Sequence, residues 1–136
     1  MSRVRFVRPE TTTLPLSDGD TITIRKRLNA GERRAMFARM YETDQEDAEG
    51  KPRLRVNTLQ TGLALVVAYL LDWSFADESG AVVSLRGLST DEVESIVNSL
   101  HPDSFAEIKT AIETYTDAVE AAEAEEKKVP SGELVL

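Results

Sequence analysis

Basic and apolar side chains alternate at the start of the chain, before a helical spacing of apolar residues takes over further on. The alternation has period two over Arg3–Val7, which is the pattern of a half-buried edge strand. It predicts a strand with Val4 and Phe6 on its inner face, ended by Pro9.

A β-hairpin is predicted directly after this strand. Residues 11–16 and 21–28 are rich in strand-forming side chains and flank residues 17–20, in which Asp18-Gly19 suits a tight turn with positive φ angles. The inward-facing side chains are expected to be Leu14, Leu16, Ile22, Ile24 and Leu28.

The first helix is predicted after Asn29 and ends near Tyr41. Asn29 and Glu32 have the spacing of a capping box, in which each side chain accepts a hydrogen bond from the other residue's backbone N–H. The apolar residues of this helix fall on one stripe, which we expect to dock on the hairpin. They are Met36, Phe37, Met40 and Tyr41.

The second helix is predicted to begin at Asn57 or Thr58 and to run through Leu71. It is apolar on nearly all sides from Leu63 onward, so we expect it to be the central core element. Gly62 inside it indicates close packing of another backbone, because glycine is otherwise unfavourable in a helix. A minor second hairpin is predicted around the turn at 77–80.

Two further helices complete the predicted fold. The third opens with a capping box of Ser89 and Glu92 and is stopped by His101-Pro102, and the last runs from 102–104 to about Lys128. Six apolar residues of the last helix share one seam, which either packs in the core or contacts a partner or a second copy. They are Phe105, Ile108, Ile112, Tyr115, Val119 and Ala122.

Two segments lack apolar periodicity. The acidic segment 42–53 is predicted to be a mobile loop, and residues 129–136 a flexible C-terminal tail. An EF-hand counted from Asp44 would place Glu49 and Arg55 where it needs glycine and glutamate, so no metal site is expected. The sequence therefore predicts one α+β domain over residues 1–128, dominated by about four helices.

Composition argues against catalysis. The chain has no cysteine and one histidine, which removes thiolate sites and leaves little for zinc or triad chemistry. We expect His101 to mark a helix boundary and Asp72, beside Trp73, to be structural. No phosphate-loop, dinucleotide or zincin motif is present. We therefore expect no catalytic residue, no cofactor and no enzymatic activity.

Charge is unevenly distributed. The net charge is −8, with +3 over residues 1–55 and −11 over residues 56–136. This balance disfavours binding of nucleic acid, and the basic stretch 25–27 is expected to be a solvated face. The asymmetry fits self-association, a basic helical partner or an acidic helix that serves solubility.

No segment is expected to enter a membrane. The longest apolar run, Leu63–Leu71, is far shorter than the roughly 20 residues of a membrane span. The first nine residues lack the apolar region of a signal peptide. We therefore expect a soluble, intracellular protein.

The order of these elements resembles the tail assembly chaperones of long-tailed, siphovirus-like bacteriophages. The resemblance covers about residues 21–122 and lies in capping and core patterns rather than in a catalytic signature. The segments that carry it are ITIRKRLNAGE at 22–32, LQTGLALVVAYLLDWSF at 59–75, LSTDE at 88–92 and LHPDSFAEI at 100–108.

This resemblance implies an assembly factor that coats and solubilises the tape measure protein and helps to recruit tail tube subunits. It implies action in the host bacterial cytoplasm and absence from the mature virion. Members are often made in two lengths by ribosomal frameshifting, for which Lys127-Lys128 is a candidate position. A second copy of the chain is a further possible partner.

A chaperone of this kind needs adaptable apolar surface with a charged rim. For each candidate side chain the alternative is an ordinary place in the core. The candidates for partner binding are Met36, Met40, Tyr69, Trp73, Phe75, Phe105, Ile108, Ile112 and Tyr115.

Two other functions are left open by the sequence. A virion structural component, such as a tail tube, connector or completion protein, would form closed rings. An acidic inhibitor that mimics nucleic acid would bind its partner with a steep dependence on salt. Chaperone binding through apolar contacts should instead survive about 0.5 M salt, where the Debye length is only a few ångströms.

Overall fold

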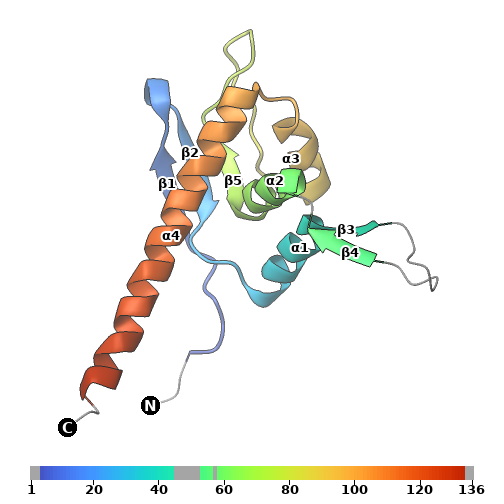
Figure 1. Cartoon of the computed structure of the whole chain (residues 1–136). Coiled ribbons are helices and arrows are strands. Elements are labelled where there is room, and N and C mark those ends of the chain that lie inside the picture. The colour runs from blue at the N-terminus through green and yellow to red at the C-terminus, as the bar shows by residue number, and fades with distance from the viewer. Residues whose placement is uncertain (1–3, 45–52, 57, 134–136) are drawn as a thin grey trace.

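Both helices and strands are present in the computed structural model of the protein, which describes residues 4–44, 53–56 and 58–133, with side chains over 4–41 and 60–126 (Figure 1). Within these residues, four helices pack with a three-stranded antiparallel sheet, which confirms the predicted helix-dominated α+β domain. The elements are β1 (Thr11–Pro15), β2 (Thr21–Arg25), α1 (Ala30–Met40), β3 (Tyr41–Asp44), β4 (Arg53–Val56), α2 (Thr58–Tyr69), β5 (Leu70–Trp73), α3 (Thr90–Val97) and α4 (Pro102–Glu133).

The predicted N-terminal hairpin is formed by β1 and β2, which pair antiparallel with Leu14 opposite Ile22. Its turn is a short 3-10 segment, Ser17–Gly19, in which Asp18 has a φ of 57° and Gly19 a φ of 79°. Asp-Gly suits this turn because these two residues adopt the left-handed region more readily than most others. β5 adds a third antiparallel strand on the other side of β2.

The core lies between the sheet and helices α2, α3 and the first part of α4. Ile22 and Ile24 of β2 are both 0% exposed, because alternate side chains of that strand share one face. α2 is buried on most sides from Leu63 onward and is the central element that the sequence predicts. The buried apolar side chains are Ile22, Ile24, Leu63, Ala64, Val66, Val67, Leu70, Trp73, Leu85, Val93, Val97, Ile108 and Ile112.

Both predicted capping boxes are present. The Asn29 side chain accepts from the Glu32 N–H at 2.8 Å, and the Glu32 carboxylate accepts from the Asn29 N–H at 2.9 Å. Ser89 and Glu92 make the same reciprocal pair at the start of α3. Each box satisfies backbone donors that the first helical turn leaves free, so it determines where the helix begins.

α1 packs against α2, and the expectation that its apolar stripe docks on the hairpin is wrong. The inner face of the hairpin is already covered by α2 and α4, with Ile22 and Ile24 inside the core. An ion pair of 2.7 Å between Arg25 Nε and Glu32 ties the start of α1 to β2. No residue of α1 is fully buried, and Phe37 remains 38% exposed.

The edge strand predicted over Arg3–Val7 is absent from the described part of that segment, residues 4–7. Val4 and Phe6 are 75% and 89% exposed rather than inward-facing. β1 already occupies the place beside β2, and Pro9 has no N–H with which to extend the ladder toward the N-terminus. The alternation of basic and apolar residues therefore does not make residues 4–7 a strand of the sheet.

The loop prediction for 42–53 is wrong at both ends, because these belong to strands. β3 and β4 pair antiparallel from Tyr41 opposite Val56 to Asp44 opposite Arg53. Backbone pairing of two neighbouring segments requires no apolar periodicity, so the pattern missed this ribbon. Residues 45–52, with most of the carboxylates considered for calcium, lie outside the described residues.

α2 ends at Tyr69, two residues before its predicted end, because Leu70 pairs with Ile24 in the main sheet. This third strand was not expected. The predicted second hairpin is accordingly reduced to a turn that is closed by a single bridge between Ala76 and Val82.

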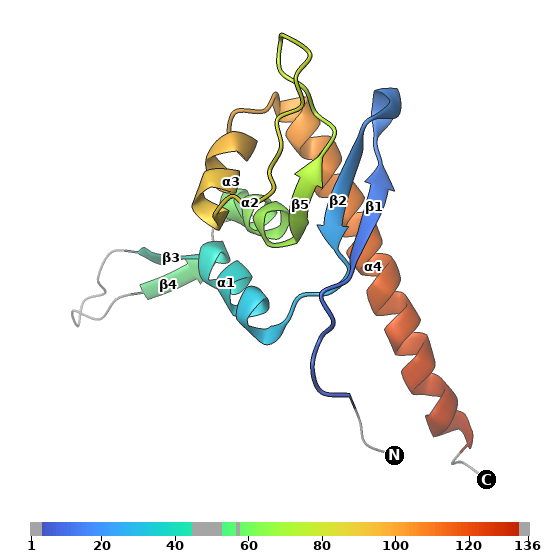
Figure 2. The ribbon, with the colours of Figure 1, turned by 180° about the vertical axis from the view of Figure 1, so that it is seen from behind.

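α4 extends further than predicted. It runs through Glu133, so the expected tail at 129–136 is helical up to that residue, and 134–136 lie outside the described residues. Figures 1 and 2 show its second half projecting beyond the sheet and the other helices.

The neighbour of Gly62 is a side chain, not the second backbone that we expected. A Cβ at Gly62 would lie 2.9 Å from Cδ of Lys109. The glycine therefore lets α2 lie close to the aliphatic part of a lysine on α4, whose side chain would otherwise have to move.

Candidate functional site

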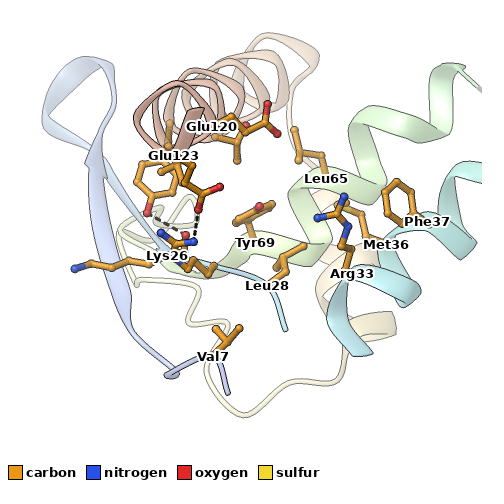
Figure 3. Close-up of a pocket in the computed structure, with 14 residues that line it drawn as sticks. Val7, Lys26, Leu28, Arg33, Met36, Phe37, Leu65, Tyr69, Glu120 and Glu123 are labelled. Atoms are coloured by element: carbon orange, nitrogen blue, oxygen red, sulfur yellow. Dashed lines mark hydrogen bonds and ion pairs between the residues drawn. The ribbon is translucent and has the colours of Figure 1, made fainter. Parts of the chain in front are cut away.

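A groove of about 420 Å³ lies between α1, α2 and α4, beside the linker that joins β2 to α1 (Figure 3). The three helices contribute most of the lining, and the linker and the N-terminal segment contribute the rest. The lining residues are Val7, Lys26, Arg27, Leu28, Arg33, Met36, Phe37, Leu65, Tyr69, Tyr115, Thr116, Val119, Glu120 and Glu123.

Apolar side chains line the inner part of this groove. Leu65 and Tyr69 are four residues apart on α2 and therefore share one side of that helix. Figure 3 shows both directed into the groove, with Leu28 beside Tyr69 and Met36 approaching from α1. All four are half-buried, so they offer partly accessible apolar surface that an incoming side chain can cover.

Charged side chains of opposite sign stand on the two walls. On α1, the guanidinium carbon of Arg33 lies 5.3 Å from the centre of the Phe37 ring, within the range of a cation–π interaction. On α4, Glu120 and Glu123 face the groove (Figure 3). The groove thus combines an apolar interior with a basic wall and an acidic wall.

Polar contacts between the linker and α4 hold the groove in shape. Arg27 forms an ion pair with Glu123, and the Tyr115 hydroxyl donates a hydrogen bond of 3.0 Å to the Lys26 carbonyl. The Lys26 ammonium lies 3.7 Å from a carboxylate oxygen of Glu10. The first two contacts connect α4 to the linker after β2, and Figure 2 shows α1 leading away from this linker on the side opposite α4.

The two tyrosines of the groove are neutral near physiological pH. Burial raises the pKa of Tyr69 above its ordinary value, and Tyr115 and Glu120 raise it further while Arg33 opposes them. Burial also raises the pKa of Tyr115, against the opposing charge of Arg27. Both phenols therefore act as apolar surface and neutral hydrogen-bonding groups rather than as nucleophiles.

Three of the nine predicted contact residues come together in the groove, namely Met36, Tyr69 and Tyr115. Met40 is half-buried further along α1 and does not line it.

The other predicted contact residues lie in or against the core. Trp73 is 6% exposed, stacks on Phe75 with ring centres 4.8 Å apart, and donates from its indole N–H to the Val83 carbonyl at 2.6 Å. Ile108 and Ile112 are 0% exposed, and Phe105 packs against the same core. A partner cannot reach the two isoleucines in this structure, so the core alternative applies to them.

Some lining residues were absent from the predicted set. Leu65 shares a helix face with Tyr69, so helical spacing was a signal that could have found it. Phe37 and Val119 belong to the predicted apolar stripe and seam but were not chosen as contacts. Val7 and Leu28 lie far apart in sequence, and only the tertiary structure brings them to the same groove.

The best catalytic candidates of the sequence have structural roles. Burial by itself would raise the pKa of Asp72, but hydrogen bonds from the backbone of Leu85 and Trp73 and from Arg86 outweigh it and hold the pKa below its ordinary value. Its two oxygens accept from Leu85 N at 3.0 Å and from Arg86 Nε at 2.9 Å. His101 is exposed, and its carbonyl accepts a hydrogen bond in the first turn of α4.

The basic stretch 25–27 is largely neutralised. Arg25 pairs with Glu32 and donates to the Ala68 carbonyl at 2.9 Å. Lys26 and Arg27 pair with Glu10 and Glu123. Each cation thus has a carboxylate partner, which weakens any attraction for phosphate groups.

Across residues 4–44, 53–56 and 58–133, no cluster of three or more histidine, aspartate or glutamate side chains is arranged to hold a metal ion. No helix in the same part of the chain combines the length and the apolar character needed to cross a membrane. In comparisons with other proteins, the chain matches no family model, no curated protein and no solved structure.

Proposed function

We propose that this protein is a non-enzymatic assembly chaperone whose groove between α1, α2 and α4 holds an apolar helical segment of a client protein. The groove itself is the observation that carries the proposal, because it exposes Met36, Leu65 and Tyr69 between walls of opposite charge. Helix-in-groove recognition uses this combination, in which apolar anchors provide affinity and the charged rim provides orientation.

The composition of the groove suits a client with a variable sequence. Methionine and leucine side chains adapt their shape to different partners, and Tyr69 adds a neutral hydroxyl. Arg33 on one wall and Glu120 on the other can meet client charges of either sign. Binding by such a groove depends more on amphipathic character than on a particular motif.

The client that we propose is the tape measure protein of a long-tailed bacteriophage. The sequence resemblance to tail assembly chaperones supports this choice, and long helical clients offer many amphipathic segments. The same proposal includes recruitment of tail tube subunits, action in the host bacterial cytoplasm, release before the mature virion, and a possible longer frameshifted form.

The test is co-expression of the protein with its cognate tape measure protein, followed by size-exclusion chromatography with light scattering. We expect a soluble complex with several copies per client that persists in about 0.5 M salt, since salt screens charges but not apolar contacts. Met36→Glu should abolish most of the complex, because it places a carboxylate in the apolar part of the groove.

Val82→Glu is the matched control. Val82 is 60% exposed in the turn after β5 and does not line the groove, so the same change there should leave the complex intact. Circular dichroism of both variants checks that they remain folded. An insoluble client, or equal binding by the two variants, would reject the proposal. A discrete ring in the absence of client would favour a virion structural component, and loss of binding in salt would favour an acidic mimic.

A further inference from the structure

A second open space, which we call the arm cleft, lies beside the N-terminal arm, defined as residues 4–8. It has a volume of about 640 Å³ and is lined by the arm, by the linker after β2 and by α4. Figures 1 and 2 show the arm leaving the sheet alongside the second half of α4. The cleft shares Tyr115 and Val119 with the client groove, but no residue of α1 or α2 lines it. It is therefore a distinct surface that adjoins the groove.

Positive charge dominates the arm cleft. Arg5, Arg8, Lys26 and Arg27 line it, and Glu10 is the one carboxylate among its lining residues. Lys26 is paired with Glu10, and Arg27 with a carboxylate of α4 outside the cleft. Among the described residues, Arg5 and Arg8 have no carboxylate partner. The cleft thus offers two unpaired guanidinium groups, which bind carboxylates through paired N–H donors.

Apolar side chains lie among these cations. Val4 and Phe6 are the most exposed large apolar side chains of the described residues, and both line the cleft together with Val119 of α4. Aliphatic side chains offer no flat face on which bases could stack, and the net charge of −8 repels a nucleic acid. A peptide segment that carries both carboxylates and apolar side chains satisfies the arginines and covers the apolar surface.

Hydrogen bonds hold the base of the cleft in place. The Glu10 N–H donates to the Arg8 carbonyl at 2.8 Å, and the Lys26 N–H donates to the Glu10 carbonyl at 2.9 Å. On the other side, the Tyr115 hydroxyl donates to the Lys26 carbonyl at 3.0 Å. The arm and α4 are thus both tied to the linker, and this preorganisation lowers the entropic cost of binding a partner.

The acidic remainder of the chain confines such a segment to this cleft. Residues 56–136 carry a net charge of −11, whereas residues 1–55 carry +3. Asp117 and Glu120 of α4 are exposed and do not line the cleft. An acidic segment is repelled by these carboxylates and attracted by the arginines of the arm, so charge gives the cleft its specificity.

We propose that the arm cleft binds an acidic apolar segment of a partner protein. The carboxylates of the segment pair with Arg5 and Arg8, and its apolar side chains cover Val4, Phe6 and Val119. This inference does not depend on the client proposed above.

The test is fluorescence anisotropy of a labelled peptide of leucine and glutamate, titrated with the full chain at low salt. Arg5→Glu and Arg8→Glu should each raise its dissociation constant about fivefold or more, because a partner of the peptide carboxylates becomes a like charge. Arg34→Glu makes the same change of charge at an exposed position of α1 outside the cleft and should leave the dissociation constant nearly unchanged. A peptide with lysine in place of each glutamate should not bind more weakly to the two arm variants.

The apolar part of the site is tested separately. Phe6→Ser should raise the dissociation constant of the same peptide about threefold or more, because apolar contact area is lost. Val82→Ser, at an exposed position of the turn after β5, is the matched control and should have no effect. Both arm positions are exposed, so these substitutions remove no core contact.

Three outcomes would overturn the proposal. The first is an acidic peptide that does not bind the wild type, or that loses equal affinity in Arg5→Glu and Arg34→Glu. The second is displacement of the peptide by an equal concentration of single-stranded DNA, which would assign the cleft to nucleic acid. The third is self-association of the wild type that Arg5→Glu abolishes, which would assign the cleft to a second copy of the chain.

These measurements contain no client, so their failure leaves the chaperone proposal standing. Met36 lines the groove and not the arm cleft, so Met36→Glu should leave binding of the acidic peptide intact. A protein that binds this peptide but no tape measure protein would reject the chaperone proposal alone.

Discussion

The inner half of α4, residues 102–115, and its outer half, residues 116–133, continue one apolar seam in different surroundings. Ile108 and Ile112 in the inner half are 0% exposed. In the outer half, Val119 is half-buried at the groove and Ala122 is exposed. The sheet and α2 cover the inner half, whereas the outer half projects past them (Figures 1 and 2).

The difference between the two halves shows what can be predicted from the spacing of apolar residues in a helix. Residues spaced three and four apart share a face of a helix, but the spacing does not tell whether another element covers that face. On the inner half the seam contributes to stability. On the outer half it leaves partly accessible side chains beside charged groups, and this surface lines the groove that we propose as the client site.

The largest expected effect on stability is at Ile112, in the buried inner half of α4. Ile112→Ala should lower the free energy of unfolding by about 2–5 kcal/mol, because it removes buried methyl groups and leaves a cavity. Val119→Ala, seven residues further along the seam, should cost less than about 1 kcal/mol, because that side chain already contacts water. Urea denaturation followed by circular dichroism measures both. Equal losses would contradict the distinction between the two halves.

An intermediate effect is expected at Asp72, which binds Leu85 and Arg86 of the loop after β5. Asp72→Asn should lower the free energy of unfolding by about 1–2 kcal/mol at neutral pH, because a neutral amide weakens the charged hydrogen bonds that the half-buried carboxylate accepts from the Leu85 N–H and from Arg86.

The pH dependence follows from the lowered pKa of Asp72. A carboxyl group whose pKa is lower in the folded state stabilises the fold above its unfolded pKa of about 3.9, and this contribution is lost as the pH falls through the folded value. The difference between the wild type and Asp72→Asn should therefore shrink as the pH is lowered below about 4. Urea denaturation at neutral and acidic pH measures it, and a difference independent of pH would argue against this role.

The smallest effect is expected at Glu123, in the outer half of α4. Glu123→Gln removes the ion pair with Arg27, whose side chain is 59% exposed, so the free energy of unfolding should fall by less than about 1 kcal/mol. Adding salt should reduce the difference further, because the pair is screened. Thermal denaturation at low and high salt tests this, and a loss as large as that of Ile112→Ala would mean that the outer half of α4 belongs to the core.

Patterns in the sequence predicted the local features of the fold well. The hairpin around Asp18-Gly19 and the boxes at Asn29 and Ser89 are present where they were predicted. Each depends on side chains and backbone groups a few residues apart, so its chemistry can be read directly from neighbouring positions. The described part of the strand predicted at Arg3–Val7, residues 4–7, has the expected alternation but pairs with no strand of the sheet.

The candidate site could be predicted only in part. Met36, Tyr69 and Tyr115 were chosen as apolar residues with some polar or adaptable character, and they do line the groove. Ile108 and Ile112 were chosen with the same seam and lie in the core instead. Membership of the seam does not separate Tyr115 from Ile108 and Ile112, because burial depends on what packs opposite each side chain.

The sequence by itself determined where helices begin, where the first hairpin turns and which apolar residues share a face, because these features depend on local backbone chemistry and on periodicity. Tertiary structure alone decided that Leu70–Trp73 joins the sheet as β5 and that Val7 and Leu28 meet the helices at one groove. It also decided that half of α4 stays uncovered. These outcomes depend on contacts between residues far apart in the chain, whose formation is governed by competition among all the apolar faces for a limited number of partners.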